Sequence, residues 1–461
     1  MAVIRWLDRH DSKSRLMKTH PPIRSLLCAA LAFVGSLFPG RTLADTANTQ
    51  AVVDAANAFL ATLSTTQKTA IDSSTSSALN TSCQYNFSLT NAEVWSNIPV
   101  ATSFSGATRN GLMLGNLTTA QQTAALDVAT AALGTTGKKL FDDIRAADRY
   151  ISGEVTNAKG SKSSAWGYGK YFIAFIGTPS TTSAWTLQLC GHHIAYNITY
   201  NGTYASCTPM FAGTEPNSWT DTTGTYAPLG TQRTLLTQLR PTLTTSALLS
   251  GTFSDVVFGP NGSGPGATSA HDTTQPKVYP TTGRGQLYSA LTSAQQALVL
   301  SYIQTWVNTR TTSETSELLA IYTSPQALAE TYIGYSGSST TLAQNANYFR
   351  VDGPRLWIEF SVQTGVYDMS SVHDHGIWRD KLADYGAAYG TTTVSTTLRP
   401  PVISTQPASA TISSGTTTLT VASSTSGTLT YQWYQDGAAI SGATNTTYSA
   451  SSAGSYYVTV L

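Results

Sequence analysis

The chain has 461 residues, roughly two to three domains in length, and only 11% of them are charged, against about 25% in an average soluble protein. Hydrophobic residues make up 41%, so the chain has enough apolar material for a large core and is not predicted to be disordered. The net charge of +1 excludes a strongly basic nucleic-acid-binding protein.

A secretory signal peptide is predicted for residues 1–44. Residues 26–38 form an apolar run too short to span a bilayer, with basic residues before it and Thr-Leu-Ala at 42–44 after it. We expect cleavage after Ala44, with Met17 as an alternative start and a membrane anchor as the competing interpretation. Residues 1–44 hold seven basic and two acidic residues, so the mature chain keeps 19 and 23, a net charge of −4.

Three cysteines remain after the predicted cleavage site. Export would permit a disulfide bond, and Cys190 and Cys207 flank a predicted hairpin, which makes them the expected pair. Cys83 is then unpaired, and we expect its side chain to be buried.

Capping boxes predict three helix starts, because Ser or Thr stands three residues before Gln in each. The three boxes are Ser64 with Gln67, Thr118 with Gln121, and Thr292 with Gln295. The second is predicted to begin an Ala-rich helix that ends near Gly134. The third is predicted to begin a helix with an apolar stripe from Leu298 to Trp306.

Between these helices the pattern favours strands, at residues 166–178, 185–200 and 348–363. Helices before and after a block of strands predict an α+β domain over residues 45–398, with an antiparallel or mixed β core and flanking helices. Residues 259–286 are rich in Gly, Pro, Ser and Thr and are predicted to form a surface loop.

A change in composition predicts a second domain at residues 399–461, after a linker at Arg399-Pro400-Pro401. This region resembles an immunoglobulin-like β-sandwich, with Trp433 as the core tryptophan and Tyr456 or Tyr457 as the tyrosine corner. The usual cysteines are absent. The chain stops at Leu461, where the sandwich still needs a final strand, so the domain is predicted to be truncated.

Four of the five histidines in the mature chain fall into two clusters, which is the main chemical signal of the sequence. If the second cluster is extended, His373 and His375 project to one face of a strand and Asp374 to the other. Two imidazoles on one face, two residues apart, suit chelation of a metal ion.

The first cluster is predicted to supply one further ligand. Adjacent His192 and His193 point in opposite directions on a regular strand. His193 shares a face with the more polar residues, so we favour it as the third ligand. His192 takes that role if a bulge at Gly191 reverses the alternation.

Two glutamates are candidates for a fourth ligand or a general base. Glu215 lies in a polar turn after the first histidine cluster, where a turn or capping contact is the alternative. Glu359 is predicted to face away from the core, where an ion pair with Arg355 or Arg350 is the alternative. Three histidines with an open position and a nearby Glu form an arrangement that activates water.

Arg379 is a candidate for binding an anionic group of a substrate, although an ion pair with Asp380 or Asp384 is favoured. The aromatic residues Trp166, Tyr168 and Trp185 are predicted to pack in the core or, alternatively, to line a carbohydrate-binding cleft. We find no nucleophile elbow, zinc helix, P-loop or dinucleotide fingerprint.

The chain resembles the DUF3500 family of secreted proteins over about residues 50–390. The segments that carry the resemblance are 171–177 (YFIAFIG), 189–197 (LCGHHIAYN), 209–216 (PMFAGTEP), 353–360 (GPRLWIEF) and 375–380 (HGIWRD). The resemblance implies that the two histidine clusters belong together, and it supplies no reaction.

We therefore expect a secreted metal-dependent enzyme, extracellular or periplasmic, that acts on an extracellular polymer or carbohydrate-related substrate. Hydrolysis with a divalent ion, zinc first, is the expected chemistry, and oxidation with copper or iron is the alternative. A non-catalytic binding or adhesion protein is the other class. We expect no nucleic-acid partner and, after signal cleavage, no membrane partner.

Overall fold

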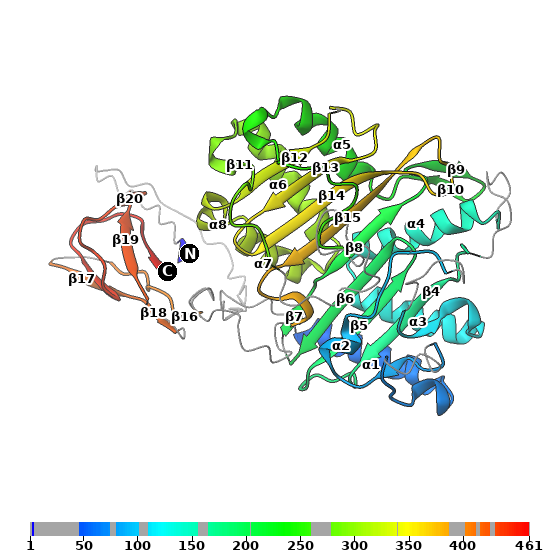
Figure 1. Ribbon diagram of the computed structural model, residues 1–461. Coiled ribbons are helices and arrows are strands. Elements are labelled where there is room, and N and C mark those ends of the chain that lie inside the picture. Colours follow the sequence, from blue (N-terminus) through cyan, green and yellow to red (C-terminus); the bar gives the residue numbers. More distant parts are fainter. Residues whose placement is uncertain are drawn as a thin grey trace, which may run out of the picture. The chain divides into compact units, whose positions relative to one another are not determined.

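The computed structural model describes residues 2–3, 46–73, 80–100, 109–154, 165–202, 204–259, 278–338, 340–386, 402–411, 415–424 and 429–460. The chain divides into two compact units: a larger one of residues 42–392, and a smaller one of residues 1–41 and 393–461 (Figure 1). The predicted signal run, the linker and most of the predicted loop at 259–286 lie outside the described residues. Among the described helices, none has the length and apolar character needed to cross a bilayer.

The larger unit combines helices with one large sheet. Its elements are α1 (Thr46–Ala61), η1 (Thr66–Lys68), β2 (Gln84–Tyr85), α2 (Leu89–Ala92), β3 (Leu112–Met113), η2 (Leu114–Asn116), α3 (Thr119–Ala132), α4 (Thr135–Ile151), β4 (Tyr171–Ile176), β5 (Trp185–Gly191), β6 (Ile194–Asn201), β7 (Tyr204–Ser206), β8 (Met210–Thr214), β9 (Trp219–Asp221), β10 (Gly224–Tyr226), α5 (Gly230–Leu239), η3 (Arg240–Thr242), η4 (Thr245–Ala247), β11 (Gln286–Leu287), η5 (Tyr288–Ala290), α6 (Ser293–Val307), α7 (Thr312–Tyr322), α8 (Pro325–Ala329), β12 (Tyr332–Ser336), β13 (Asn347–Asp352), β14 (Leu356–Thr364), β15 (Val372–Asp380) and η6 (Asp384–Gly386).

The sheet has twelve strands in the order β11-β12-β13-β14-β15-β8-β6-β5-β4-β2, with β3 beside β4 and β7 beside β6. Its pairings are antiparallel except for β2, which runs parallel to β4. The predicted α+β class with a mixed sheet and flanking helices is confirmed. Two strand predictions are wrong in extent: residues 185–200 form the β5–β6 hairpin, and residues 348–363 belong to the β13–β14 hairpin.

The capping boxes are confirmed by reciprocal hydrogen bonds. Thr118 caps α3 together with Gln121, and Thr292 caps α6 together with Gln295. Ser64 and the side chain of Gln67 exchange the same pair of bonds, but there the chain forms only the short 3₁₀ helix η1. The local signal therefore predicts the capping contact reliably, and tertiary packing decides how far the helix continues.

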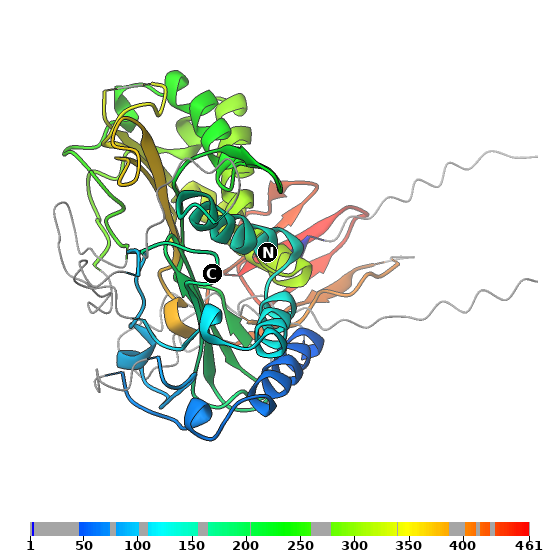
Figure 2. The same cartoon turned by 90° about the vertical axis from the view of Figure 1, so that its right-hand side faces the viewer.

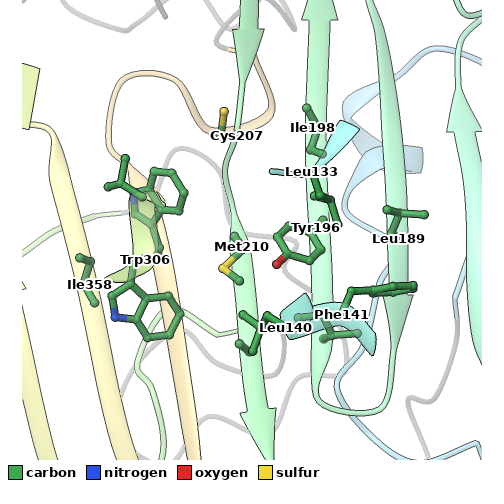
Figure 3. Close-up of a cluster of buried hydrophobic side chains, with 14 of the residues drawn as sticks. Leu133, Leu140, Phe141, Leu189, Tyr196, Ile198, Cys207, Met210, Trp306 and Ile358 are labelled. Atoms are coloured by element: carbon green, nitrogen blue, oxygen red, sulfur yellow. The ribbon is translucent and has the colours of Figure 1, made fainter. Parts of the chain in front are cut away.

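The two faces of the sheet are covered differently, and we call them the helix face and the loop face. The helix face carries Leu189 of β5, Tyr196 of β6 and Met210 of β8, which pack against helices α1, α3, α4 and α6 (Figures 2 and 3). The loop face carries Phe172, Cys190, Ala195, Phe211 and Ile377, which pack against Trp95 and Val256 of loop segments. Both faces are therefore buried.

The predicted disulfide between Cys190 and Cys207 is wrong. Cys190 packs in the loop-face cluster, whereas Cys207 packs in the helix-face core (Figure 3). The sheet separates the two thiols, and both are free. Cys83 is buried as predicted, and burial raises the pKa of each of these thiols to about 12.

The smaller unit consists of small antiparallel sheets. Its strands are β1 (Ala2–Val3), β16 (Val402–Thr405), β17 (Thr417–Thr420), β18 (Ala422–Ser424), β19 (Tyr431–Gln435), β20 (Ala438–Ala439), β21 (Thr447–Ala450) and β22 (Tyr456–Val460). They form one four-stranded sheet, β1-β22-β19-β20, and two two-stranded sheets, β16-β18 and β17-β21. Trp433 is fully buried among Leu419, Val421, Ala450 and Val458, as expected of a core tryptophan.

Candidate metal centre

Strand β15 positions two histidines on the loop face. Its residues are extended and pair with both β14 and β8, so the side chains alternate between the faces. His373 and His375 lie on one face, and Asp374 lies on the other, where it forms an ion pair with Arg233 of α5. The predicted alternation at this cluster is confirmed.

The first histidine cluster forms the tight turn that joins β5 to β6, rather than part of a strand. His193 has a φ of +64°, in the left-handed region that non-glycine residues rarely occupy. Its amide donates to the carbonyl of Asn97 (3.3 Å), and its own carbonyl accepts from the amide of Gly213 (2.7 Å). This conformation directs His193, and not His192, toward the histidines of β15.

His193, His373 and His375 converge into one buried cluster, with one ligand nitrogen from each within 4.8 Å of the others. The Nε2 atoms of His373 and His375 lie 3.1 Å apart. Two nitrogens bound tetrahedrally to zinc at ~2.0–2.1 Å would lie about 3.3 Å apart. The geometry therefore fits a metal ion held by three imidazoles, with one position left for another ligand.

The electrostatics of the cluster favour neutral imidazoles. Burial lowers the pKa of His193 well below its usual range, and the neighbouring histidines lower it further. Burial, together with His375 and His192, lowers the pKa of His373 to about 3. A metal ligand must be deprotonated, so both side chains are ready to bind an ion at neutral pH.

His375 is oriented by side chains beyond the cluster. Its Nδ1 lies 3.0 Å from Oδ1 of Asp255 and 3.0 Å from Nε2 of Gln363. Because a carboxylate can only accept, Nδ1 donates its hydrogen to Asp255 and Nε2 presents its lone pair to the cluster. In this tautomer the amide nitrogen of Gln363 is a packing contact of Nδ1 and not a second hydrogen bond. A carboxylate behind a ligating histidine is a common feature of zinc sites.

Gly213 on β8 makes room for the cluster. A Cβ at this position would lie 2.8 Å from Cδ2 of His375 and 3.0 Å from Cδ2 of His193. The sequence patterns did not single out Gly213, although a glycine inside a strand is a known sign of close approach. Asp255 and Gln363 were not expected at the site either, because the sequence carries no local signal for them.

Glu215 lies directly after β8, next to the pairing of Thr214 with Asp374. Its Oε1 accepts from the amides of Tyr367 (2.8 Å) and Asp368 (3.1 Å). Its Oε2 is buried and has no hydrogen-bond partner in the described part of the chain. Glu215 is not among the converging ligands, but it retains one free buried carboxylate oxygen.

Glu359 is placed on the loop face, as predicted, but away from the cluster. Its carboxylate accepts from the amides of Val257 and Phe258, from Tyr348 (2.7 Å) and from the indole of Trp357 (2.8 Å). Burial raises its pKa, and these hydrogen bonds oppose that change. Both oxygens are used to anchor the loop that carries Asp255.

Arg379 forms a buried ion pair with Asp384 (2.7 Å) and donates to the carbonyl of Phe258 (2.8 Å). Of the two predicted partners, Asp384 is therefore confirmed, while Asp380 pairs with Arg355. Arg379 lies four residues beyond His375 on β15, and its guanidinium binds the loop at Phe258 and Asp384 of η6.

The three aromatic residues considered for a carbohydrate-binding cleft, Trp166, Tyr168 and Trp185, lie in different surroundings. Trp185 is core and stacks on Tyr200, with ring centroids 4.8 Å apart. Tyr168 lies beneath the guanidinium of Arg145, at 4.0 Å. Trp166 is the one near the histidines, with its ring 6.4 Å from that of His192.

The fold and the cluster together define an α+β protein with a buried three-histidine site that could hold a metal ion. The chain belongs to the DUF3500 family, described as "Protein of unknown function (DUF3500)", whose match covers residues 45–387. No curated protein and no solved structure matches the chain.

Proposed function

We propose that this protein is a metal-dependent hydrolase whose metal ion is held by His193, His373 and His375. The observation that carries the proposal is the convergence of three buried imidazoles from two separate hairpins. A zinc ion bound by three histidines with an open position lowers the pKa of water and activates it as a nucleophile.

The residues of the chain have distinct proposed roles. Asp255 holds His375 with its Nε2 directed to the ion, and Gly213 leaves space for the rings. Glu215 is the proposed acceptor of the proton from water, because it directly follows β8, two residues beyond Gly213, and its buried Oε2 has no hydrogen-bond partner in the described part of the chain. Glu359 and Arg379 keep the loop above β14 and β15 in place and take no part in the chemistry.

The composition of the cluster favours zinc over non-haem iron. Within the described residues, the converging group holds three histidines and no carboxylate. It therefore lacks the two-histidine, one-carboxylate set of many non-haem iron oxygenases. Copper remains compatible with three imidazoles and defines the rival, oxidative function.

We also propose that the enzyme is exported and acts on an extracellular polymer or carbohydrate-related substrate. The apolar run before Ala44 supports export. The smaller unit is proposed to be an immunoglobulin-like module that attaches the enzyme to its surroundings. Buried Trp433 and the bond from the hydroxyl of Tyr456 to the carbonyl of Ser452 (3.0 Å) support that assignment.

The proposal is tested by metal analysis of the full chain, purified without chelators or a histidine tag. We expect about one zinc per chain in the wild type and in His271→Ala, which changes a histidine outside both clusters, and none in His373→Ala/His375→Ala. Hydrolysis of nitrophenyl esters, phosphates and glycosides is then compared among the three proteins. Bound copper without zinc would replace hydrolysis by oxidation, and a wild type that takes up no metal would refute the site and favour adhesion.

A further inference from the structure

A fourth histidine, His192, lies beside the three-histidine cluster and has a carboxylate partner of its own. The Nδ1 of His192 is 2.6 Å from Oδ1 of Asp148, which extends from helix α4. Both side chains are buried. Because the carboxylate accepts, Nδ1 of His192 carries the hydrogen, and the contact fixes the plane of its ring.

This fixed ring is stacked on a proposed ligand. The centroids of His192 and His193 are 3.7 Å apart and their planes are inclined by 27°. The hydroxyl of Tyr171 also donates to the carbonyl of His192 (3.0 Å). The turn is therefore held through its backbone by Tyr171 and through its side chain by Asp148.

The turn needs such support because His193 occupies the left-handed region. A non-glycine residue in that region persists only where surrounding contacts enforce it, and such residues gather at functional sites. The ring of His192, which Asp148 anchors, supplies such a contact because it stacks on the ring of His193. This contact holds the direction in which the ligand nitrogen of His193 points.

We propose that Asp148 is a positioning residue of the metal site: it holds the ring of His192, which in turn holds the ring of His193 in the direction of the ion. The inference rests on the proposed metal site. Asp148 and His192 supply no ligand, and their contribution is to the orientation of the third one.

The test is a mutant cycle on the full chain with two probes, Zn²⁺ affinity by competition with a chromophoric chelator and the visible spectrum of bound Co²⁺. Asp148→Ala is expected to weaken Zn²⁺ binding about tenfold and to change the Co²⁺ bands. Asp148→Asn is expected to lose less, because an amide oxygen still accepts. Asp127→Ala, at an exposed carboxylate on α3, is the matched control and is expected to behave as wild type.

The cycle also separates positioning from a general effect on the fold. If Asp148 acts through His192, Asp148→Ala/His192→Ala binds Zn²⁺ no more weakly than His192→Ala alone. Additive losses would overturn the proposal, and so would wild-type affinity and spectra in folded Asp148→Ala or, if that variant does not fold, in Asp148→Asn. A wild type that binds neither ion overturns the metal site itself, which is a distinguishable result.

Discussion

Tyr196 and Asn197 are neighbours on β6, yet they are buried on opposite faces of the sheet by different interactions. Tyr196 packs in the apolar core of the helix face. Asn197 accepts from Gln188 (2.8 Å) and donates to the carbonyl of Pro209 (3.0 Å) on the loop face. The helix face buries the larger apolar core, whereas the loop face combines a smaller apolar cluster with paired polar groups such as Asn197 and Gln188. The histidine cluster therefore lies where a buried polar side chain can be satisfied.

The largest expected effect is on the helix face. Trp306 of α6 is fully buried there, so Trp306→Ala should lower the free energy of unfolding by about 3–5 kcal/mol. Urea unfolding followed by circular dichroism measures the loss. Zn²⁺ affinity below the transition should stay near that of the wild type. A variant of normal stability with weakened metal binding would contradict the division between the faces.

Low pH should destabilise the protein through the buried histidines of the loop face. Because the pKa of His373 is lowered from 6.5 to about 3 in the folded protein, the unfolded chain binds an extra proton between these values. The contribution of His373 to stability is complete above pH 6.5 and is lost as the pH falls toward 3, at up to about 1.4 kcal/mol per pH unit. Urea midpoints of chelator-treated protein from pH 6.5 to 4.5 measure this slope, which should be shallower in His373→Asn. Equal slopes in the wild type and in His373→Asn would show that folding does not lower the pKa of His373.

Two glycines offer a matched pair, one on each face. A Cβ on Gly376 would lie 2.3 Å from the ring of Trp306, so Gly376→Ala should cost about 1–3 kcal/mol of stability. A Cβ on Gly213 would press on His375 and His193, so Gly213→Ala should mainly weaken Zn²⁺ binding. Urea denaturation measures the loss of stability in each variant, and titration measures the loss of Zn²⁺ affinity. Equal losses of stability and of affinity in both variants would contradict the difference between the two faces.

The smallest expected effect comes from reduction. Cys190 and Cys207 lie on different faces as free thiols, so a phosphine reductant should leave the melting temperature unchanged within about 1 °C. A disulfide between them would contribute about 3 kcal/mol, and its reduction would lower the melting temperature clearly. Thiol titration should accordingly find these cysteines unreactive until the protein unfolds.

Sequence patterns predicted the parts of this structure that depend on neighbours in the chain. Alternation placed His373 and His375 on one face of a strand and Asp374 on the other, and the capping boxes of Thr118 and Thr292 formed as expected. The grouping of the histidines pointed to the site. These features follow from local periodicity and hydrogen bonding, which a single sequence contains.

The remaining features depend on contacts between distant segments. The chain turns at His192 and His193, and neither position holds the glycine or asparagine that usually marks a tight turn. The pattern therefore predicted a single strand over residues 185–200. Asp148 comes from a helix and Asp255 from a loop, and no spacing rule joins either to a histidine. The hydrogen-bond donors around Glu359 could not be predicted either, because alternation predicts the face on which a side chain lies but not the groups that it contacts there.

The position of the cluster in the sheet has a consequence for how the two halves of the sheet are held together. Strands β2 to β8 come from residues 84–214 and strands β11 to β15 from residues 286–380, and among the described strands the two sets pair where β8 meets β15. His193 belongs to the first set and His373 and His375 to the second, about 180 residues further along the chain. The three ligands therefore come together only when the two halves of the sheet are docked, so a bound ion would act as a cross-link across that seam and would stabilise the docked state.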